Sequence, residues 1–450
     1  MFGLHSRHRV DASWSAMSRR QWLRRAIGSC AAVGGAAVAA RSSLSAVAAL
    51  AQTPASDADY WKRVRAEFLL DKDWTYLNNG TLGPTPKPVY FTLVERYHDL
   101  AQDPGGPNAE QSAAAEDVRR KAAAFVGADA DEIALVRNTT EGMSFMLNGL
   151  DLQAGDEILT TFHEHSGGLQ PCRLKAKRHG VVIKEVKWPA PAEDPGVILN
   201  AFNDAMTPRT KVIMASHAMY QTGSSIPLKE LAALARARGI ITAIDGAHPV
   251  GMIKMDMHDL GVDYYASSSH KWLCAPTGAG ILYLRRASQE LLWPTTVSTG
   301  WDDPKRGAAR YDRLSQRAHP IVQAIGAAVD FQNAIGRERI EARVRELHGY
   351  LRQRIARLPG VRFHTSAHSQ LSGGLLAFTL PALKNADVVE TLKKRHRIWT
   401  RTMEYDLNAV RISTHIYNSE TDIDALVAGL EDILKGNVVR APATGAEADD

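Results

Sequence analysis

The strongest chemical signal in the sequence is a lysine that follows three serines and a histidine, in residues 267–272 (Ser-Ser-Ser-His-Lys-Trp). Residues 264–266 before it are expected to form a strand, which places Lys271 just beyond a strand end. A lysine amine in such a place can form a Schiff base with a carbonyl group, and neighbouring hydroxyl groups can hold a phosphate. A surface lysine is the commoner explanation of any one lysine, so this motif alone decides little.

A carboxylate, Asp245, lies 26 residues before Lys271 and closes another predicted strand. Pyridoxal phosphate needs a carboxylate beside its ring nitrogen, because the protonated ring withdraws electrons from the substrate Cα atom. An aspartate that only caps the next helix is the alternative.

A third motif, residues 138–142 (Asn-Thr-Thr-Glu-Gly), joins a predicted strand to a helix start. Backbone N–H groups at a helix N-terminus can bind a phosphate. Taken alone, the motif is better explained as an ordinary threonine cap with a capping-box residue. The three motifs together predict a cofactor site that includes a lysine, a carboxylate and a phosphate cradle.

Alternating strands and helices must position these residues. The expected strands are 133–136, 157–160, 181–186, 212–215, 240–244, 264–266 and 280–284, and the expected helices between them include 141–150, 169–179, 197–206 and 228–238. This alternation predicts an α/β fold with a mostly parallel sheet covered on both faces. Ligands of such sheets bind at the carboxyl ends of the strands, where the three motifs lie.

The same pattern divides the chain into parts. We expect an N-terminal segment over 52–75, a large cofactor-binding domain over 76–300, and a linker helix with a smaller C-terminal α/β domain over 301–436. A helical region is expected over 321–358, with a break at Gly336. Residues 437–450 are expected to be a disordered tail.

The net charge is concentrated at the N-terminus. The chain has a formal charge of +5, but residues 1–51 contain seven arginines and one acid, which leaves 47 basic and 48 acidic residues beyond them. A nucleic-acid partner is therefore not expected. No apolar run reaches the roughly 18 residues of a membrane-spanning helix.

The basic N-terminus resembles a twin-arginine export signal. Residues 18–24 (Ser-Arg-Arg-Gln-Trp-Leu-Arg) precede a weakly apolar alanine and glycine stretch over 26–40, and small residues end at Ala51, where cleavage is expected. An amphipathic helix is the alternative, which the glycines of the stretch disfavour. The resemblance implies export through the twin-arginine machinery to the periplasm, and a cofactor already bound before export.

The mature chain keeps two cysteines, Cys172 and Cys274. Two cysteines make no zinc framework, and no other metal-ligand spacing occurs, so no metal site is expected.

With these motifs in this order, residues 74–433 resemble the class V aminotransferases, which are pyridoxal-phosphate enzymes of fold type I, and most closely their isopenicillin N epimerase-like branch. The motifs that carry the resemblance are residues 76–80 with 83–84, 137–141, 164–166, 245–248, 268–271, and 411–413 with 417–418.

The resemblance implies a role for each matching residue. Lys271 would bind the cofactor covalently and then exchange the proton at Cα. The other expected cofactor contacts are Asp245 at the ring nitrogen, His248 at the phenolic oxygen, His165 stacked on the ring, and Thr140, the amide of Glu141, Ser268 and His270 around the phosphate. Arg411 would grip the substrate carboxylate, with Asn79 and Gly80 beside it. An ordinary histidine without a cofactor role remains an alternative for His165.

The sequence leaves the reaction open among transamination, epimerisation, β-elimination and decarboxylation. Persulfide-forming desulfuration is disfavoured, because the family's desulfurases use a cysteine in the C-terminal third and no cysteine follows Cys274. A cofactor-less scaffold protein is the non-enzyme alternative. We expect an amino-acid or peptide-like substrate and a homodimer.

Overall fold

The computed structural model describes residues 49–50, 52–54, 59–105, 108–381, 383–403 and 407–442. The predicted export signal, apart from residues 49 and 50, lies outside the described residues, as do residues 443–450 of the predicted tail.

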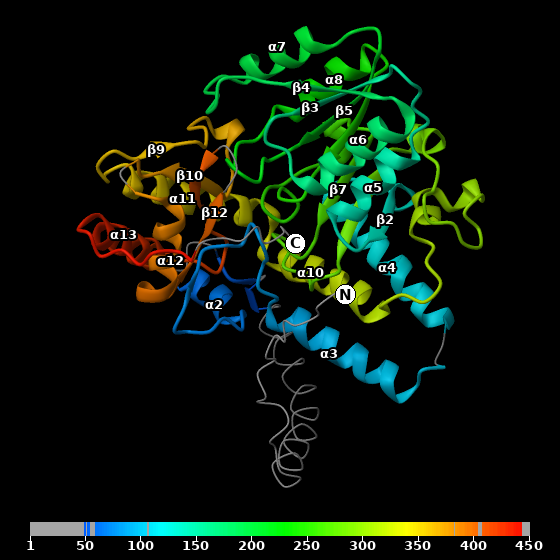
Figure 1. Cartoon of the computed structure of the whole chain (residues 1–450). Coiled ribbons are helices and arrows are strands. Elements are labelled where there is room, and N and C mark those ends of the chain that lie inside the picture. The colour runs from blue at the N-terminus through cyan, green and yellow to red at the C-terminus, as the bar shows by residue number, and fades with distance from the viewer. Residues whose placement is uncertain are drawn as a thin grey trace, which may run out of the picture.

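A seven-stranded sheet forms the centre of the large domain (Figure 1). Its strand order is β2-β8-β7-β6-β5-β3-β4; the strands are β2 (Ile133–Val136), β3 (Glu157–Thr161), β4 (Val182–Val186), β5 (Thr210–Ser216), β6 (Ile241–Asp245), β7 (Tyr264–Ser268) and β8 (Gly280–Leu284). Strands β3 to β7 run parallel, and β8 is antiparallel to both β7 and β2. The predicted α/β class with a mostly parallel sheet is confirmed.

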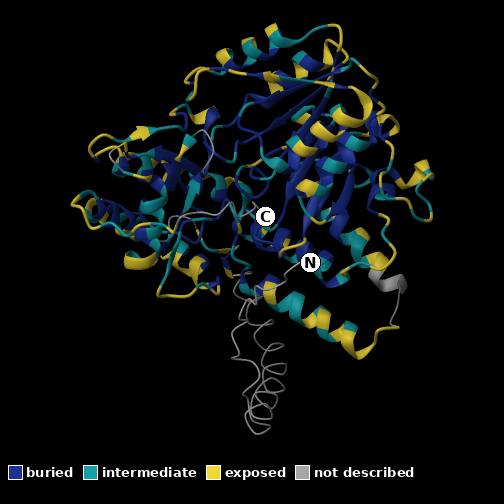
Figure 2. Ribbon diagram, viewed as in Figure 1, coloured by how far each residue is buried: buried dark blue, intermediate teal, exposed yellow. Residues whose placement is uncertain are grey.

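Helices cover both faces of this sheet, because successive side chains on a strand point to opposite faces. On β7, Tyr264 packs in the core under α5 (Thr139–Gly149) and α6 (Ser166–His179). The next residue, Tyr265, belongs to the opposite core, under α7 (Pro195–Ala205) and α8 (Leu228–Arg236). Figure 2 shows the sheet buried between these layers. The strands read as continuous apolar runs for this reason.

Three further helices pack together beside the sheet. Helices α3 (Lys87–Gln102) and α4 (Asn108–Val126) were not expected from the sequence, and both contact α10 (His319–Ile335). The remaining short elements are α2 (Tyr60–Ala66), α9 (Met257–Leu260) and the 3₁₀ helices at Ala130–Glu132, Arg286–Leu291, Pro304–Asp312 and Ser369–Leu371. The expected helix break occurs at Gly336, whose φ of 99° separates α10 from α11 (Arg337–Ile355).

The smaller domain is a four-stranded antiparallel sheet backed by helices. The sheet order is β12-β13-β10-β9, with β9 (Arg362–Phe363), β10 (Leu375–Thr379), β12 (Arg401–Met403) and β13 (Ala409–Ser413). Helices α11, α12 (Asn385–His396) and α13 (Glu420–Leu434) complete its core. In Figure 1 this domain lies beside the large sheet.

The two ends of the described chain differ from the expected boundaries. Strand β1 (Thr75–Tyr76) pairs with β11 (Ile398–Trp399), so the N-terminal segment joins the small domain. The start of the predicted tail packs on α12, where the amide of Val439 donates to Thr391 Oγ1 at 2.8 Å. Only long-range contacts make these connections, and local sequence patterns do not show them.

No helix within the described ranges is long and apolar enough to cross a membrane.

Candidate active site

A pocket lies where the carboxyl ends of the large sheet face the small domain. It encloses about 210 Å³. Its lining comes from four regions of the chain: Gly80 and Thr81; Asn138, Thr139, Thr140 and His165; Tyr220, Asp245, Ala247, Ser268, His270 and Lys271; and Arg401 and Arg411. The structure therefore brings eight of the eleven predicted residues together: Lys271, Asp245, His165, Thr140, Ser268, His270, Arg411 and Gly80.

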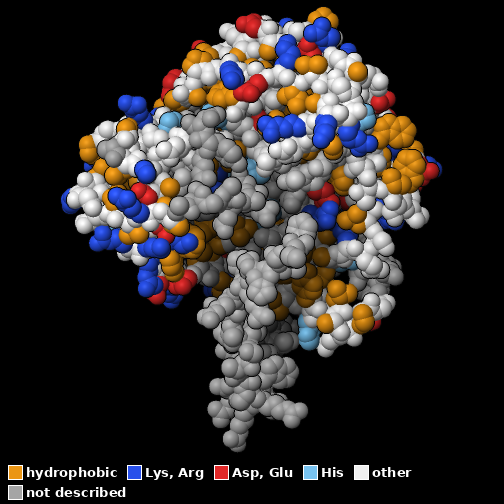
Figure 3. All heavy atoms as spheres, in the orientation of Figure 1, with side chains coloured by type: hydrophobic (Ala, Val, Ile, Leu, Met, Phe, Trp, Pro, Cys, Tyr) orange, Lys and Arg blue, Asp and Glu red, His pale blue; other side chains and the backbone are white. Residues whose placement is uncertain are grey.

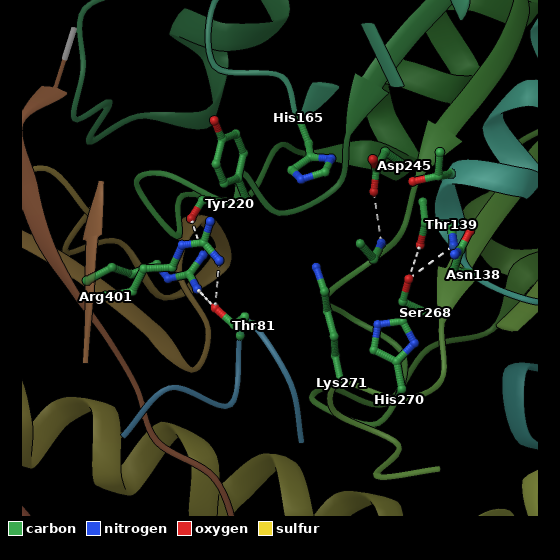
Figure 4. Close-up of a pocket in the computed structure, with 14 residues that line it drawn as sticks. Thr81, Asn138, Thr139, His165, Tyr220, Asp245, Ser268, His270, Lys271 and Arg401 are labelled. Atoms are coloured by element: carbon green, nitrogen blue, oxygen red, sulfur yellow. Dashed lines mark hydrogen bonds between the residues drawn. The ribbon is translucent and has the colours of Figure 1, made fainter. Parts of the chain in front are cut away.

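Lys271 lies in a tightly held loop after β7. Its amide donates to the Ser268 carbonyl at 3.1 Å, and the following carbonyl, of Trp272, accepts from Gln332 at 2.6 Å. Figure 4 shows its amine directed into the pocket. Burial lowers the pKa of Lys271 to about 8, opposed by Asp245 and reinforced by Arg411 and Arg401. A larger fraction of this amine is therefore neutral near pH 7 than of an ordinary lysine amine.

Asp245 ends β6 with a carboxylate that is almost fully buried. One carboxylate oxygen accepts from the Ala247 amide at 3.0 Å, which fixes the side chain at the edge of the pocket. This arrangement suits a buried counter-charge for a protonated ring nitrogen.

His248 does not line the pocket but lies behind it. The Trp272 indole donates to its Nδ1 at 3.1 Å, and its buried Nε2 has no hydrogen-bond partner. Burial, with smaller contributions from Lys271, Arg411 and His165, places its pKa well below the usual range, so the ring is neutral. A neutral ring whose Nδ1 accepts carries its proton on Nε2. That unpartnered N–H is available to a cofactor oxygen.

The phosphate cradle differs in part from its prediction. Ser268 Oγ accepts from the Thr139 amide at 3.0 Å and lies 2.8 Å from Thr139 Oγ1, at the start of α5. His270 lines the same end; burial, then Lys271, lower its pKa to about 4, and its Nδ1 is unpartnered. Backbone amides at this helix start favour an anion.

Glu141 is the residue of the cradle that lies outside the pocket lining. Its amide donates to Asn138 Oδ1 at 2.9 Å, and its carboxylate accepts from the Arg137 guanidinium at 2.6 Å. The expected amide is thus already used as a helix cap, and Asn138 and Thr139 line the pocket in its place. The helix is capped, but by Asn138 rather than by the threonine that the capping alternative expected.

His165 and Tyr220 lie across the pocket from the Lys271 loop (Figure 4). Their rings pack edge to face with their centroids 5.0 Å apart, and His165 Nδ1 accepts a hydrogen bond from the Gly167 amide at 3.0 Å. Both contacts hold the imidazole in one orientation, as a ring that stacks on a cofactor requires.

Arg411 comes from β13 of the small domain and is buried. Its guanidinium donates to the Tyr220 carbonyl at 2.8 Å and to Thr81 Oγ1 at 2.9 Å. A carboxylate would strengthen this arrangement, since hydrogen bonds between ionised groups are about twice as strong as neutral ones.

Of the two residues predicted beside Arg411, only Gly80 borders the pocket. Asn79 is fully buried behind it, where Tyr417 donates to its Oδ1 at 3.2 Å. Residues 79–81 form a turn after β1, and of these Gly80 and Thr81 line the pocket.

Thr81, Tyr220 and Arg401 are lining residues that the sequence analysis missed. None of the three belongs to a motif with a chemical signature, and no strand was predicted at Arg401.

The residues present fit pyridoxal phosphate. The pocket combines an amine with a lowered pKa, a buried carboxylate and an anion cradle at a helix start, and the unpartnered imidazole N–H of His248 lies behind it. When bound, the cofactor supplies an electron sink for the substrate Cα atom. Lys271 would hold it covalently, with Asp245, His248 and His165 around the ring and Ser268, His270, Thr139 and Thr140 around the phosphate.

We predict a pH dependence for covalent attachment of the cofactor. Because only the neutral amine reacts, the attachment rate should rise about tenfold per pH unit below pH 8 and level off above it. Asp245→Asn should move the midpoint to lower pH, since Asp245 raises this pKa. The measurement is the rate at which pyridoxal phosphate attaches to the protein, trapped by borohydride at set times. This rate is divided by the rate for Nα-acetyllysine, whose ε-amine is free, at the same pH. A midpoint near 10 would contradict the prediction.

Gly83 connects the N-terminal segment to the lysine loop. Its amide donates to the His270 carbonyl at 2.9 Å, and a Cβ atom here would lie 1.9 Å from the Lys271 carbonyl oxygen. Gly83→Ala should therefore lower the stability by about 1–3 kcal/mol and reduce cofactor occupancy. The matched control is Gly349→Ala in α11, where a Cβ meets no atom within 4 Å. Thermal unfolding and visible absorbance of both variants provide the test; equal melting temperatures would exclude the contact.

Among the residues that the structure describes, one further group has side chains of the types that bind metals, namely Asp129, Glu132 and His258. Glu132 accepts from His258 Nε2 at 2.6 Å, and Arg286 pairs with Asp129 at 2.9 Å. These internal ion pairs account for the group.

Comparison with known proteins agrees with this site. The model of the family described as aminotransferase class-V matches residues 75–426. The isopenicillin N epimerase of Amycolatopsis lactamdurans is 32% identical over 399 residues, covering 83% of this chain and 99% of that protein. The isopenicillin N epimerase of Streptomyces clavuligerus is 33% identical over 388 residues, covering 82% of this chain and 98% of that protein.

Among solved structures, a mutant of C-DES with glycine covalently linked to its pyridoxal-phosphate cofactor is similar. Its TM-score is 0.75 at 26% identity, over 82% of this chain and 99% of that chain. C-DES is described as a cystine C–S lyase. The chain therefore belongs to the class V aminotransferase family, whose members are pyridoxal-phosphate enzymes of fold type I.

Proposed function

We propose that this enzyme acts at the Cα atom of an amino-acid or peptide-like substrate and that its reaction is a transamination. The observation that carries the proposal is that the Lys271 amine points into the pocket (Figure 4), which Arg411 also lines. One group can hold a substrate carboxylate while the other moves a proton at the neighbouring carbon.

The residues suggest the order of events. Arg411 binds the carboxylate with two parallel hydrogen bonds and thereby fixes the direction of the Cα–H bond. The Lys271 amine, released by the substrate, takes the proton from Cα as a general base. In a transamination Lys271 would carry this proton away from Cα, while the bound cofactor would supply the electron sink and retain the amino group until a second keto acid accepts it.

Epimerisation is the second candidate, favoured by the two isopenicillin N epimerases among the relatives. It requires that the proton return to the opposite face of Cα. His165 lies across the pocket from the Lys271 loop, and its imidazole is a suitable proton donor there.

The deciding experiment is incubation of the pure enzyme with amino acids in D₂O, with and without a keto acid. Transamination predicts a keto-acid product that depends on the acceptor. Epimerisation predicts inverted amino acid with deuterium at Cα and no acceptor requirement. Pyruvate and ammonia formed without an acceptor would indicate β-elimination.

A persulfide-forming desulfuration remains disfavoured. No cysteine lines the pocket within the described part of the chain, and both described cysteines are buried. Burial raises the pKa of the Cys274 thiol, and its sulfur lies 3.6 Å from the Lys271 carbonyl oxygen. This thiol is therefore a poor nucleophile.

The scaffold alternative makes a different prediction. A protein without cofactor would lack visible absorbance, whereas the proposed enzyme absorbs at about 420 nm when purified.

We further propose export through the twin-arginine machinery to the periplasm, supported by residues 18–24 and the small residues before position 52. Replacing Arg19 and Arg20 with lysine should leave the precursor uncleaved in the cytoplasm, folded and with its cofactor. Cell fractionation with an antibody measures this. Normal export of the substituted precursor would show that another route is used.

A homodimer is also proposed. Three large apolar side chains within residues 291–297 are more than half exposed: Leu291 (53%), Trp293 (62%) and Val297 (60%). Light scattering on the purified enzyme measures the mass.

On the face seen in Figure 3, basic and acidic side chains are interspersed, which does not favour a nucleic-acid surface.

A further inference from the structure

Trp272, the residue after Lys271, is a fully buried tryptophan that contacts a site residue. Its indole N–H donates to Nδ1 of His248 at 3.1 Å. An indole can only donate a hydrogen bond, whereas a neutral imidazole has one nitrogen that donates and one that accepts. Because Nδ1 is the acceptor here, the proton of the neutral His248 ring must be on Nε2. Trp272 therefore sets the tautomer of His248.

The same contact keeps the His248 ring neutral. A protonated imidazole has an N–H group on both nitrogens, so its Nδ1–H would face the indole N–H of Trp272. Burial, then the positive charges of Lys271 and Arg411, act in the same direction and place the pKa of His248 well below its usual range. The ring thus presents one N–H group, and that group is on Nε2.

This Nε2–H group has no hydrogen-bond partner within the described part of the chain, although the atom is buried. Buried polar groups without a partner are rare in proteins, and each needs an explanation, such as a ligand. Ala247 and Lys271, the residues that precede His248 and Trp272, both line the pocket. The hydrogen-bonded pair therefore borders the pocket, and a ligand oxygen there would complete the hydrogen bonding of His248.

Trp272 is itself held by neighbours from several elements. Its carbonyl accepts from Gln332 of α10 at 2.6 Å and from His415, which follows β13, at 2.8 Å. His415 also packs edge to face on the indole, with the ring centroids 5.1 Å apart. On the six-membered ring of the indole, a Cβ atom added at Gly374 would lie 2.4 Å away. The direction of the indole N–H is fixed by these contacts.

We propose that Trp272 is a positioning residue for pyridoxal phosphate: its indole N–H holds the proton of His248 on Nε2, where it donates to the phenolic oxygen of the cofactor. This role rests on the proposed function, because it requires the cofactor in the pocket. Without the indole N–H, both tautomers of His248 become accessible. The Nδ1–H tautomer would offer the cofactor oxygen a lone pair in place of an N–H group.

The variant that tests this role replaces Trp272 with benzothienylalanine, in which a sulfur atom takes the place of the indole N–H and the ring size is nearly kept. The two hydrogen bonds to the Trp272 carbonyl do not depend on this change. Trp272→Phe is the second variant and also removes the donor. The matched control is Trp188→Phe, which alters a buried tryptophan of the large domain that packs on Phe162.

Nitrogen NMR of enzyme with isotope-labelled histidines measures the tautomer, and the His248 signals are assigned from their loss in His248→Gln. Spectra are recorded on the purified enzyme with its cofactor and after the cofactor is removed, because a bound cofactor itself favours Nε2–H. Wild type and Trp188→Phe should show Nε2–H in both states. The benzothienyl variant and Trp272→Phe should lose this preference when the cofactor is removed.

Equilibrium dialysis on the same samples measures the affinity for pyridoxal phosphate. The dissociation constant should rise about 2- to 10-fold in the benzothienyl variant, which is the range expected for the loss of one neutral hydrogen bond. It should rise at least as much in Trp272→Phe, where packing is lost as well. Trp188→Phe should leave the dissociation constant unchanged.

A proton on Nδ1 of His248 in the wild type overturns the proposal, as does a benzothienyl variant that keeps the Nε2–H tautomer without cofactor. An altered tautomer with an unchanged dissociation constant also overturns it, because the cofactor would then not use this N–H group. Failure of the proposed function gives a different result. Enzyme that shows both expected changes but converts no amino acid in the D₂O experiment contradicts that function and leaves the role of Trp272 in place.

Discussion

Lys271→Ala should abolish both the visible absorbance of the cofactor and the activity. The residue provides the covalent attachment and the general base, and general acid–base catalysis alone contributes about 10²–10⁴-fold. We therefore expect the rate to fall by about 10³-fold or more. The fold should persist, because the alanine removes a buried amine with a lowered pKa and leaves the backbone bonds of the loop in place.

Borohydride reduction followed by mass spectrometry of the peptides measures the attachment directly. Lys211→Ala is the matched control, since Lys211 is an exposed lysine on β5 and should change neither property. Cofactor that is still trapped in Lys271→Ala would move the attachment to another lysine and contradict the assigned site.

Asp245→Asn and Arg411→Lys should fail in different ways. The asparagine keeps the volume of Asp245 but removes the charge that holds the ring nitrogen protonated, so kcat should fall while KM changes little. The lysine in Arg411→Lys keeps the positive charge but cannot make bidentate hydrogen bonds to a carboxylate, so KM should rise. Hydrogen bonds to charged groups contribute about 1.5–3 kcal/mol, which corresponds to about 10- to 150-fold in kcat/KM for each variant.

Steady-state kinetics and absorption spectra, taken on both variants with the substrate found in the D₂O experiment, separate the two roles. Arg411→Lys should leave the cofactor spectrum nearly unchanged. Bleaching of the cofactor in Arg411→Lys, or an unchanged kcat in Asp245→Asn, would show that the roles are wrongly assigned.

Much of the large domain followed from the sequence. Every strand from 133 to 284 was predicted to within a few residues, because buried parallel strands form continuous apolar runs between amphipathic helices. Helices α3 and α4 were missed, and their partner, α10, meets them only in the fold.

The site divides in the same way. The sequence by itself predicted Lys271, Asp245 and Ser268 as neighbours, because each lies at or just beyond the end of a strand of one sheet and strand ends of a parallel sheet converge. It also suggested Glu141, whose amide the structure assigns to Asn138 in a helix cap. That choice depends on the rotamer of one side chain, which no spacing in the sequence encodes.

Only the tertiary structure decided the substrate end of the pocket. Arg401 faces Arg411 through the register of two strands, and both meet Thr81, which lies 320 residues earlier than Arg401 in the chain. Local propensity acts over a few residues, whereas such a meeting requires the packing of two domains and the pairing of β1 with β11. The sequence thus determined the cofactor chemistry from adjacent residues, and the fold decided which charges the substrate meets.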